Sequence, residues 1–301
     1  MSLGTFIHAV CTPLQEDDSL HHEGLEIHLR DQWEHGADGL LVGGTMGMMQ
    51  LLRDTTYREL VERSIQVSAG RGEVLVGAGD TSFGRTRDRI EFLNGHSIDG
   101  VVVLAPYLFR SRDPDLVLYY KALADVSRAP IYLYDLPGLT GVNIPLDTYY
   151  AVAEHPNIRG AKISGRFVVA RHLIDTIGDR FRVIIAEPDM VDLTLAQGFD
   201  QQLDGVFAVA PHILARLRSA VTAGDMEQAK ADANLLVRLR NDLREASNGA
   251  ALVTAWLELR AVPGNTYFPP SGPLTDAERS ELLTDDIVRE LSADTVAAKA
   301  P

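Results

Sequence analysis

The chain contains few lysines. Only four of its 28 basic residues are lysine, and the other 24 are arginine. Lys121, Lys230 and Lys299 lie among polar neighbours, as solvated surface residues do. The fourth, Lys162, lies in the short β-like run NIRGAKISG at 157–165. A chain that uses arginine for almost every cation therefore places a lysine where an uncharged residue would be expected, which makes Lys162 a candidate for chemistry that arginine cannot perform.

Other classes of feature are also scarce or absent. A single cysteine, Cys11, excludes an intramolecular disulfide and indicates a reducing compartment, and its apolar surroundings predict a small buried side chain. The net charge of −14, without a basic cluster, disfavours nucleic-acid and membrane-surface roles. No apolar run approaches the roughly 20 residues of a membrane span, and the N-terminus lacks a basic segment followed by an apolar one. We therefore expect a cytoplasmic globular protein.

Short apolar runs recur along the first two thirds of the chain, each followed by a longer amphipathic segment. Uninterrupted runs of β-branched and large aliphatic residues are typical of parallel strands that are covered on both faces. Eight β-then-α units predict a (β/α)8 TIM barrel, with a doubly wound sheet as the alternative. The runs are TFIHAVCT, DGLLVGG, EVLVGAGD, DGVVVLAP, PIYLYDL, IRGAKIS, FRVIIAEP and DGVFAVAP.

Strand signals stop after Pro211, and the rest of the chain is predicted to be helical. We place the barrel at residues 1–223 and a C-terminal helical region at 224–301. The predicted helices cover 213–223, 225–245, 249–259 and 275–291. A segment rich in proline, glycine and asparagine, AVPGNTYFPPSGPLT, predicts a loop before the last helix, and the tail SADTVAAKAP is expected to fray.

The active sites of TIM barrels lie at the carboxyl ends of the strands, where Lys162 is predicted to be. Burial of a lysine lowers its pKa and populates the neutral amine, which can attack a carbonyl carbon and form a Schiff base. The alternative is a structural lysine, paired with a carboxylate of the barrel such as Asp135 or Glu187.

Two further strand ends carry candidate functional groups. The glycine-rich loop at 43–47 could present main-chain N–H groups to a carboxylate, or could be no more than a tight turn between a strand and a helix. Tyr134 could move protons, or could be a packed core aromatic, since the run PIYLYDL holds two tyrosines.

Three motifs in this order resemble those of the dihydrodipicolinate synthase and N-acetylneuraminate lyase family: GGTMGMM, YDLPGLTGVNI and GAKISG. The resemblance covers the whole chain and implies a TIM barrel followed by C-terminal helices, usually assembled as a tetramer. It implies that Lys162 forms the Schiff base with a 2-oxo acid such as pyruvate and that Tyr134 transfers protons near it. It also implies that Thr45, with the backbone around Gly44, belongs to the catalytic site.

The chain departs from the family pattern at several positions. Met46 and Met48 replace a hydroxyl residue and an acid in the glycine loop, so that one contact to the pyruvate carboxylate is lost. Tyr107 stands one place before the family's second tyrosine, whose position is occupied by Leu108. Leu139 stands where synthases have an arginine that holds the aldehyde's carboxylate.

The resemblance to sialic acid lyases is similarly incomplete. The sequence GLTG around Leu139 is similar to theirs. Their polar residues after strands seven and eight are largely replaced, however, by Pro188 and Val209, and only Asp189 remains. Neither named activity fits the chain well. We expect the side chains that bind substrate to be Met46, Tyr107, Leu139, Asp189 and Val209, together with the backbone of Gly44.

No metal or cofactor is expected. His22 and Glu26 are one helical turn apart, but they lie at the start of a predicted helix, where a solvated face is the simpler interpretation. The loops after the seventh and eighth predicted strands lack the glycine-rich anion site with which many barrels bind phosphate. A phosphorylated substrate is therefore disfavoured.

The sequence thus predicts a Schiff-base-forming lyase that acts on a 2-oxo acid and a less polar aldehyde, without selecting among cleavage, condensation and dehydration. It is expected to be a homo-oligomer, a dimer or a tetramer. The second hypothesis is a non-catalytic binding or regulatory protein on a barrel that has lost its activity, because apolar residues replace polar ones at several positions. Arg110 and Arg166, on loops at strand ends, could supply the missing cation.

Overall fold

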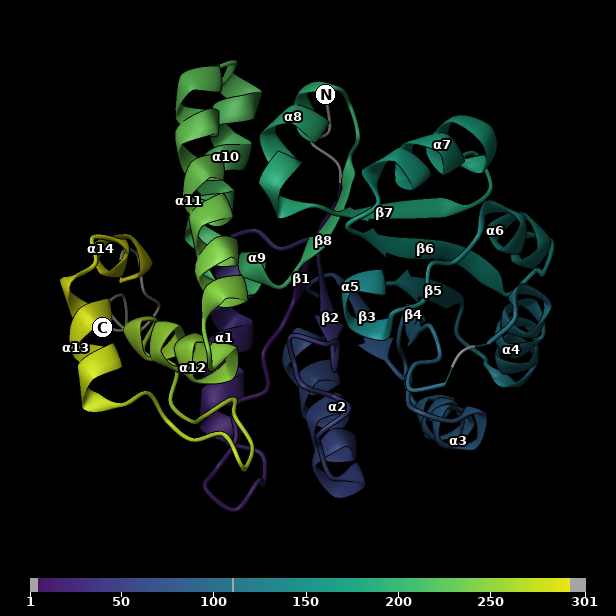
Figure 1. The fold of residues 1–301 in the computed structure, drawn as a ribbon, viewed down its shortest axis with the longest axis horizontal. Coiled ribbons are helices and arrows are strands. Elements are labelled where there is room, and N and C mark those ends of the chain that lie inside the picture. Colours follow the sequence, from purple (N-terminus) through teal and green to yellow (C-terminus); the bar gives the residue numbers. More distant parts are fainter. Residues whose placement is uncertain (1–4, 110, 293–301) are drawn as a thin grey trace. The chain divides into compact units, whose positions relative to one another are not determined.

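The structure is a computed structural model that describes residues 5–109 and 111–292 (Figure 1). Eight parallel strands form a closed barrel in sequence order, which confirms the predicted TIM barrel and excludes the doubly wound sheet. Arg110 and the tail from residue 293 onward lie outside the described residues. The strands are β1 (Thr5–Ala9), β2 (Gly39–Val42), β3 (Glu73–Gly77), β4 (Gly100–Leu104), β5 (Ile131–Asp135), β6 (Ile158–Ser164), β7 (Arg182–Ala186) and β8 (Gln201–Asp204).

Helices follow the strands and continue beyond the barrel to form the C-terminal region. Those of the barrel are α1 (His22–Glu34), α2 (Asp54–Ser68), α3 (Phe83–Leu93), α4 (Asp113–Val126), α5 (Pro137–Thr140), α6 (Leu146–Ala153), α7 (Phe167–Ile177) and α8 (Val191–Ala196), with a 3-10 turn, η1 (Pro188–Met190), before α8. Those that follow are α9 (Val206–Val209), α10 (Pro211–Ala223), α11 (Met226–Glu245), α12 (Gly249–Leu259), α13 (Asp276–Thr284) and α14 (Ile287–Leu291).

The described chain divides into two compact units. Unit 1 comprises residues 5–72, 188–200 and 204–292, and unit 2 comprises residues 73–187 and 201–203, apart from residue 110. The first two strands therefore belong to the same unit as the C-terminal helices. The predicted boundary at residue 223, between the barrel and the C-terminal helical region, refers to the order of the elements along the sequence. It remains a prediction.

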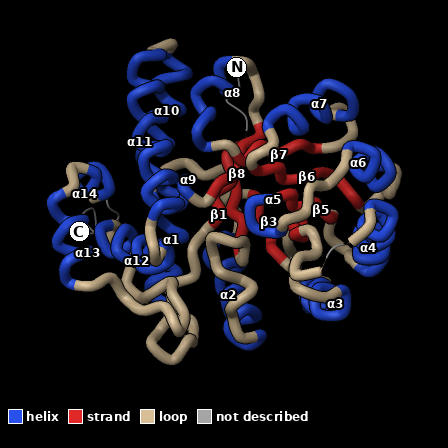
Figure 2. Tube along the Cα trace, in the orientation of Figure 1, coloured by secondary structure: helices blue, strands red, loops and turns tan. Residues whose placement is uncertain are grey.

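The strands of unit 2 are buried on both faces, which explains why apolar and polar residues do not alternate along them. Every residue of β4 and of β5 is buried, as expected for strands covered on both faces. In Figure 2 the strands β4 to β7 lie side by side, with the helices of this unit around them. Helix α4 buries Leu116, Tyr120 and Leu123. Its N-cap is Arg112, whose backbone N–H donates a hydrogen bond to the Asp115 carboxylate.

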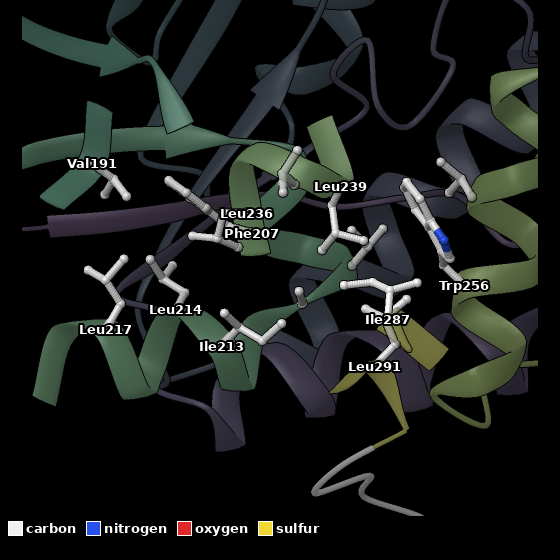
Figure 3. Close-up of a cluster of buried hydrophobic side chains, with 14 of the residues drawn as sticks. Val191, Phe207, Ile213, Leu214, Leu217, Leu236, Leu239, Trp256, Ile287 and Leu291 are labelled. Carbon is white, nitrogen blue, oxygen red and sulfur yellow. The ribbon is translucent and has the colours of Figure 1, made fainter. Parts of the chain in front are cut away.

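The core of unit 1 is built largely by the helices after the barrel. Figure 3 shows side chains of α10, α11 and α12 meeting in one hydrophobic cluster, which also contains Phe6 of β1. Cys11 is a fully buried member of this cluster, and burial raises the pKa of its thiol to about 12. The prediction that Cys11 is a small buried side chain is confirmed.

The eighth strand lies earlier in the chain than predicted. The run Val206–Val209 is the short helix α9, and the strand is the preceding Gln201–Asp204. The chain turns after β8, where Asp204 accepts a hydrogen bond from the Val206 N–H at 3.0 Å. The next residue is glycine because a Cβ on Gly205 would lie 2.8 Å from Cγ of Met46. A short apolar run fits a buried helix as well as a strand, so that part of the prediction was wrong.

The C-terminal helices match the sequence interpretation closely. Helices α10, α11 and α12 agree with the predicted ranges to within two residues, and residues 260–275 form the expected connection. The last predicted helix is divided into α13 and α14, because Asp285 has an extended backbone and accepts a hydrogen bond from the Ile287 N–H. Within the described residues, no helix is long and apolar enough to cross a membrane.

Candidate active site

Lys162 and Tyr134 meet on neighbouring strands of unit 2. They are direct partners in the register of β6 and β5, so that their side chains point to the same face of the sheet. Nζ of Lys162 donates a hydrogen bond to the Tyr134 hydroxyl at 2.8 Å, and each side chain is only 4% exposed. The pair predicted from the sequence is thus assembled at the carboxyl ends of the strands, as barrel chemistry requires.

Strand β6 reaches this position because of a glycine. A Cβ on Gly160 would lie 2.1 Å from the Arg182 carbonyl oxygen of β7, so that only glycine allows the two strands to approach here. Gly160 pairs with Arg182, and two residues later Lys162 pairs with Ile184. The glycine of the motif GAKISG therefore allows β6 to pair with β7 two residues before Lys162.

The carboxylate of Asp135 has other partners than Lys162. It accepts hydrogen bonds from the Tyr149 hydroxyl at 2.7 Å and from Arg166 at 2.5 Å. Burial is the largest influence on its pKa, which is raised, while both partners act in the opposite direction. Within the described part of the chain Lys162 forms no ion pair, and the alternative of a structural pair with Asp135 is not observed.

The same contacts decide the role of Arg166. Its guanidinium also donates to the Ile144 carbonyl oxygen at 2.8 Å, and its side chain is 18% exposed. Arg166 therefore pairs with the buried Asp135 through Nη1, a contact that orients its side chain. The buried group of Asp135, Tyr149 and Arg166 was not predicted, and the one signal for it in the sequence is the acid that follows Tyr134.

Tyr107 lies in the segment that follows β4. Desolvation and the negative charge of Asp80 raise the pKa of its hydroxyl, while Arg85 and Arg89 oppose this shift. The next residue, Leu108, has a φ of 82° and a side chain that is 74% exposed. A bulky residue in the left-handed region marks strained backbone at the position where the family has its second tyrosine.

The glycine-rich loop of residues 43–47 lies in unit 1 and forms a tight turn. Gly43 has a φ of 61°, which glycine adopts without strain. The hydroxyl of Thr12 donates to the Gly47 carbonyl oxygen at 2.7 Å, and a Cβ on Gly47 would lie 3.0 Å from that hydroxyl. The turn that the sequence offered as one alternative is therefore present. Thr45 and Met46 are half-buried at its tip, and Gly44 is buried.

The remaining expected site residues lie in different surroundings. Asp189, in η1, pairs with Arg240 of α11, and Val209 is fully buried in the core cluster of unit 1. Leu139, in α5 of unit 2, is 61% exposed. Their roles toward a substrate remain predictions from the resemblance.

The supposed metal site has the contacts of a solvated surface. His22 lies 3.3 Å from Glu59, and Glu26 pairs with Arg30 and Arg63. Across residues 5–109 and 111–292 there is no group of three or more His, Cys, Asp or Glu side chains arranged to hold a metal ion.

Comparison with known proteins gives one consistent family. The model of the dihydrodipicolinate synthetase family matches residues 2–288. A 4-hydroxy-tetrahydrodipicolinate synthase of Mycolicibacterium paratuberculosis is 30% identical over 296 residues, which cover 95% of this chain and 94% of that protein. A second synthase with this name, from Halalkalibacterium halodurans, is 29% identical over 290 residues, 94% of this chain and 96% of that protein.

Solved structures share the fold along nearly the whole chain. YagE, a prophage protein of E. coli K12 belonging to the dihydrodipicolinic acid synthase family and solved in complex with pyruvate, has a TM-score of 0.86 at 24% identity, covering 97% of this chain and 99% of its own. A variant of the Sulfolobus solfataricus 2-keto-3-deoxygluconate aldolase has a TM-score of 0.85 at 20% identity and covers 98% of both chains.

Proposed function

The chain belongs to the dihydrodipicolinate synthetase family, a family of lyases, and from this premise we propose that it forms a Schiff base between Lys162 and a 2-oxo acid such as pyruvate. One observation carries the proposal: the only described lysine inside the barrel strands donates a hydrogen bond to a buried tyrosine hydroxyl at 2.8 Å. Pyruvate is the ligand of the related YagE structure, which supports it as the first 2-oxo acid to test.

The contact suits both steps of imine formation. In its neutral form Nζ of Lys162 attacks the C2 carbonyl carbon and forms a C–N bond, while the carbonyl oxygen takes up a proton. The resulting hydroxyl then leaves as water after a second protonation. The Tyr134 hydroxyl lies within hydrogen-bond distance of Nζ and can accept the proton that Nζ loses and supply the protons that the departing oxygen takes up, which is its proposed role.

The glycine-rich loop is proposed to bind the carboxylate of the 2-oxo acid through backbone N–H groups and Thr45. The turn is held by Thr12, so its N–H groups are oriented before a ligand arrives. Met46 and Met48 offer no hydrogen bonds at the two positions where the family has polar side chains, and the backbone would have to make most of the contacts.

The aldehyde partner is proposed to be less polar than aspartate semialdehyde or N-acetylmannosamine. Leu139 replaces the arginine that binds a carboxylate in synthases, and Arg166 pairs with Asp135. Burying a polar group without a hydrogen bond costs roughly 1–3 kcal/mol, and a charge costs far more. Short, deoxygenated or aromatic aldehydes meet this restriction, and Leu139→Arg is expected to improve kcat/KM for aldehydes that carry a carboxylate.

A homo-oligomer remains part of the proposal. Leu108 and Phe109 are 74% and 78% exposed, which is unusual for adjacent large apolar side chains and is explained if a second copy covers them. Light scattering coupled to size exclusion would give the mass in solution, and a monomer at micromolar concentration would contradict this part alone.

The central test is borohydride reduction in the presence of pyruvate, followed by measurement of the intact mass. We expect one covalent adduct per chain that is absent in Lys162→Arg, whereas Lys121→Arg, an unrelated lysine on α4, keeps it. Absence of an adduct with several 2-oxo acids would refute the imine. The alternative of a non-catalytic binding protein would then have to be reconsidered, although family membership does not favour it.

A further inference from the structure

A cavity of about 240 Å³ lies in unit 1 beside the glycine-rich loop, and no step proposed above uses it. Thr45, Met46 and Met48 form one wall, and the facing wall comes from α11, α12 and the loop after them. The residues of the facing wall are Leu243, Gly249, Ala250, Val253 and Thr266. The lining contains no charged side chain and is mostly apolar.

The facing wall is held in place by its own contacts. Asn248 caps α12 by accepting from the Ala251 N–H at 3.2 Å, and its side-chain amide donates to the Gly272 carbonyl oxygen at 2.8 Å. Thr266 donates to the Ala250 carbonyl oxygen at 2.8 Å. A Cβ on Gly249 would lie 3.0 Å from Cδ1 of Leu243, so α11 and α12 approach closely there. The cavity is therefore pre-formed, as ligand pockets usually are.

The loop wall consists largely of two methionines. Met46 packs against Gly205, where a Cβ would lie 3.0 Å from its sulfur, so this contact restricts the Met46 side chain. Met48 has a φ of 54°, which fixes the loop in a conformation that few non-glycine residues adopt. Thioether side chains adapt to irregular apolar groups, and their sulfur atoms contact aromatic rings favourably.

Size and polarity restrict the occupant. An apolar cavity of about 150 Å³ is large enough to bind benzene, so a cavity of about 240 Å³ can hold a ring with one or two small substituents. A charged group would find no counter-ion among the lining residues. We propose that this cavity binds an uncharged apolar or aromatic group of about the size of a substituted phenyl ring.

Binding of such a group does not depend on the proposed function. Only the question of whether the group is part of the substrate rests on it. The group could be part of the aldehyde partner or a separate small molecule, and the chemistry that the cavity recognises is the same for both. Thr45 belongs both to the cavity wall and to the loop proposed to bind the carboxylate, so we expect a bound group to affect carboxylate binding.

The direct test is titration of the protein, labelled with 13C at the methionine methyl groups, with toluene. We expect saturable shifts of the Met46 and Met48 methyl signals, assigned from Met→Leu variants. The Met226 signal, from a residue at the exposed start of α11, should not move. Ala250→Leu, which fills the cavity from a half-buried position, should reduce toluene affinity at least tenfold. The matched control Ala231→Leu, at an exposed position of α11, should not.

The catalytic arm then separates the two sources. If the group belongs to the substrate, Ala250→Leu should lower kcat/KM for benzaldehyde with pyruvate at least tenfold and leave acetaldehyde unaffected. If the group is a separate molecule, both aldehydes should respond equally to Ala250→Leu, while toluene still binds the unaltered protein. Methionine signals that do not move up to the solubility limit of toluene, or that move equally in Ala250→Leu, overturn the proposal. Toluene binding requires no imine. The titration therefore tests the cavity proposal independently of the borohydride experiment.

Discussion

Buried histidines should make unit 1 sensitive to acid. His8 and His28 are each at most 1% exposed, and desolvation lowers the pKa of both to about 4. In the unfolded chain a histidine titrates near pH 6.5. Between these values the unfolded state binds more protons than the folded state, so the free energy of unfolding falls as the pH decreases from about 6.5 to about 4.

The size of the effect follows from the two pKa values. At pH 5 each histidine should lower the free energy of unfolding by about 2 kcal/mol relative to pH 7, and the two together by about 4 kcal/mol. His212 of the same unit changes stability in the same direction, because desolvation lowers its pKa to about 4. His35, whose pKa is raised through its contacts with Asp31, acts in the opposite direction and offsets part of the loss.

Urea unfolding at pH 7 and pH 5, followed by tryptophan fluorescence, measures this difference. Both tryptophans, Trp33 and Trp256, belong to unit 1 and report on the unit that contains these histidines. His28→Gln should reduce the difference between the two pH values by about 2 kcal/mol, even if it lowers stability at both. His22→Gln, at an exposed histidine, should leave the difference unchanged. Equal stability of the unaltered protein at pH 5 and pH 7 would refute the reasoning.

Three further predictions concern unit 2. Tyr134→Phe should lower kcat for the productive aldehyde by roughly 10²-fold or more with little change in Tm, since the ring is kept and the proton donor is lost; unchanged turnover would contradict its role. Arg166→Met should lower the free energy of unfolding by about 3 kcal/mol or more because Asp135 stays buried without its cation, whereas Arg166→Lys should lose less, and equal losses in a urea titration would argue against the ion pair. Leu108→Gly should have a higher Tm than Leu108→Ala, because both variants lose the same apolar side chain but only glycine relieves the left-handed backbone; an equal or lower Tm for Leu108→Gly would show that φ at Leu108 carries no strain.

The barrel could be predicted because parallel strands buried on both faces are written as uninterrupted apolar runs. Seven of the eight runs contain the observed strands. The eighth was misplaced because its last strand, Gln201–Asp204, contains three polar residues, while the apolar run that follows is the buried helix α9. Apolar character marks burial and does not by itself distinguish a strand from a short helix.

The hydrogen-bonded pair of Lys162 and Tyr134 could be singled out because its signals are local. Lys162 stands out among the four lysines by its sequence surroundings, and Tyr134 occupies the corresponding strand end one unit earlier. The cavity beside Met46 could not be found in this way, since its walls come from segments about 200 residues apart in the sequence. Nor does the sequence say that Arg166 pairs with a buried acid.

Two neighbouring residues at the end of β5, Tyr134 and Asp135, point to opposite faces of the strand and make different contacts. Tyr134 points toward Lys162, so the next residue, Asp135, must point to the opposite face, where it meets Tyr149 of α6 and Arg166 at the N-cap of α7. Arg166 follows β6 by two residues, and the ion pair therefore ties the end of β6 to the end of β5. The buried ion pair therefore helps to hold β5 and β6 in the register that places Nζ of Lys162 2.8 Å from the Tyr134 hydroxyl, the contact on which the proposed imine chemistry depends.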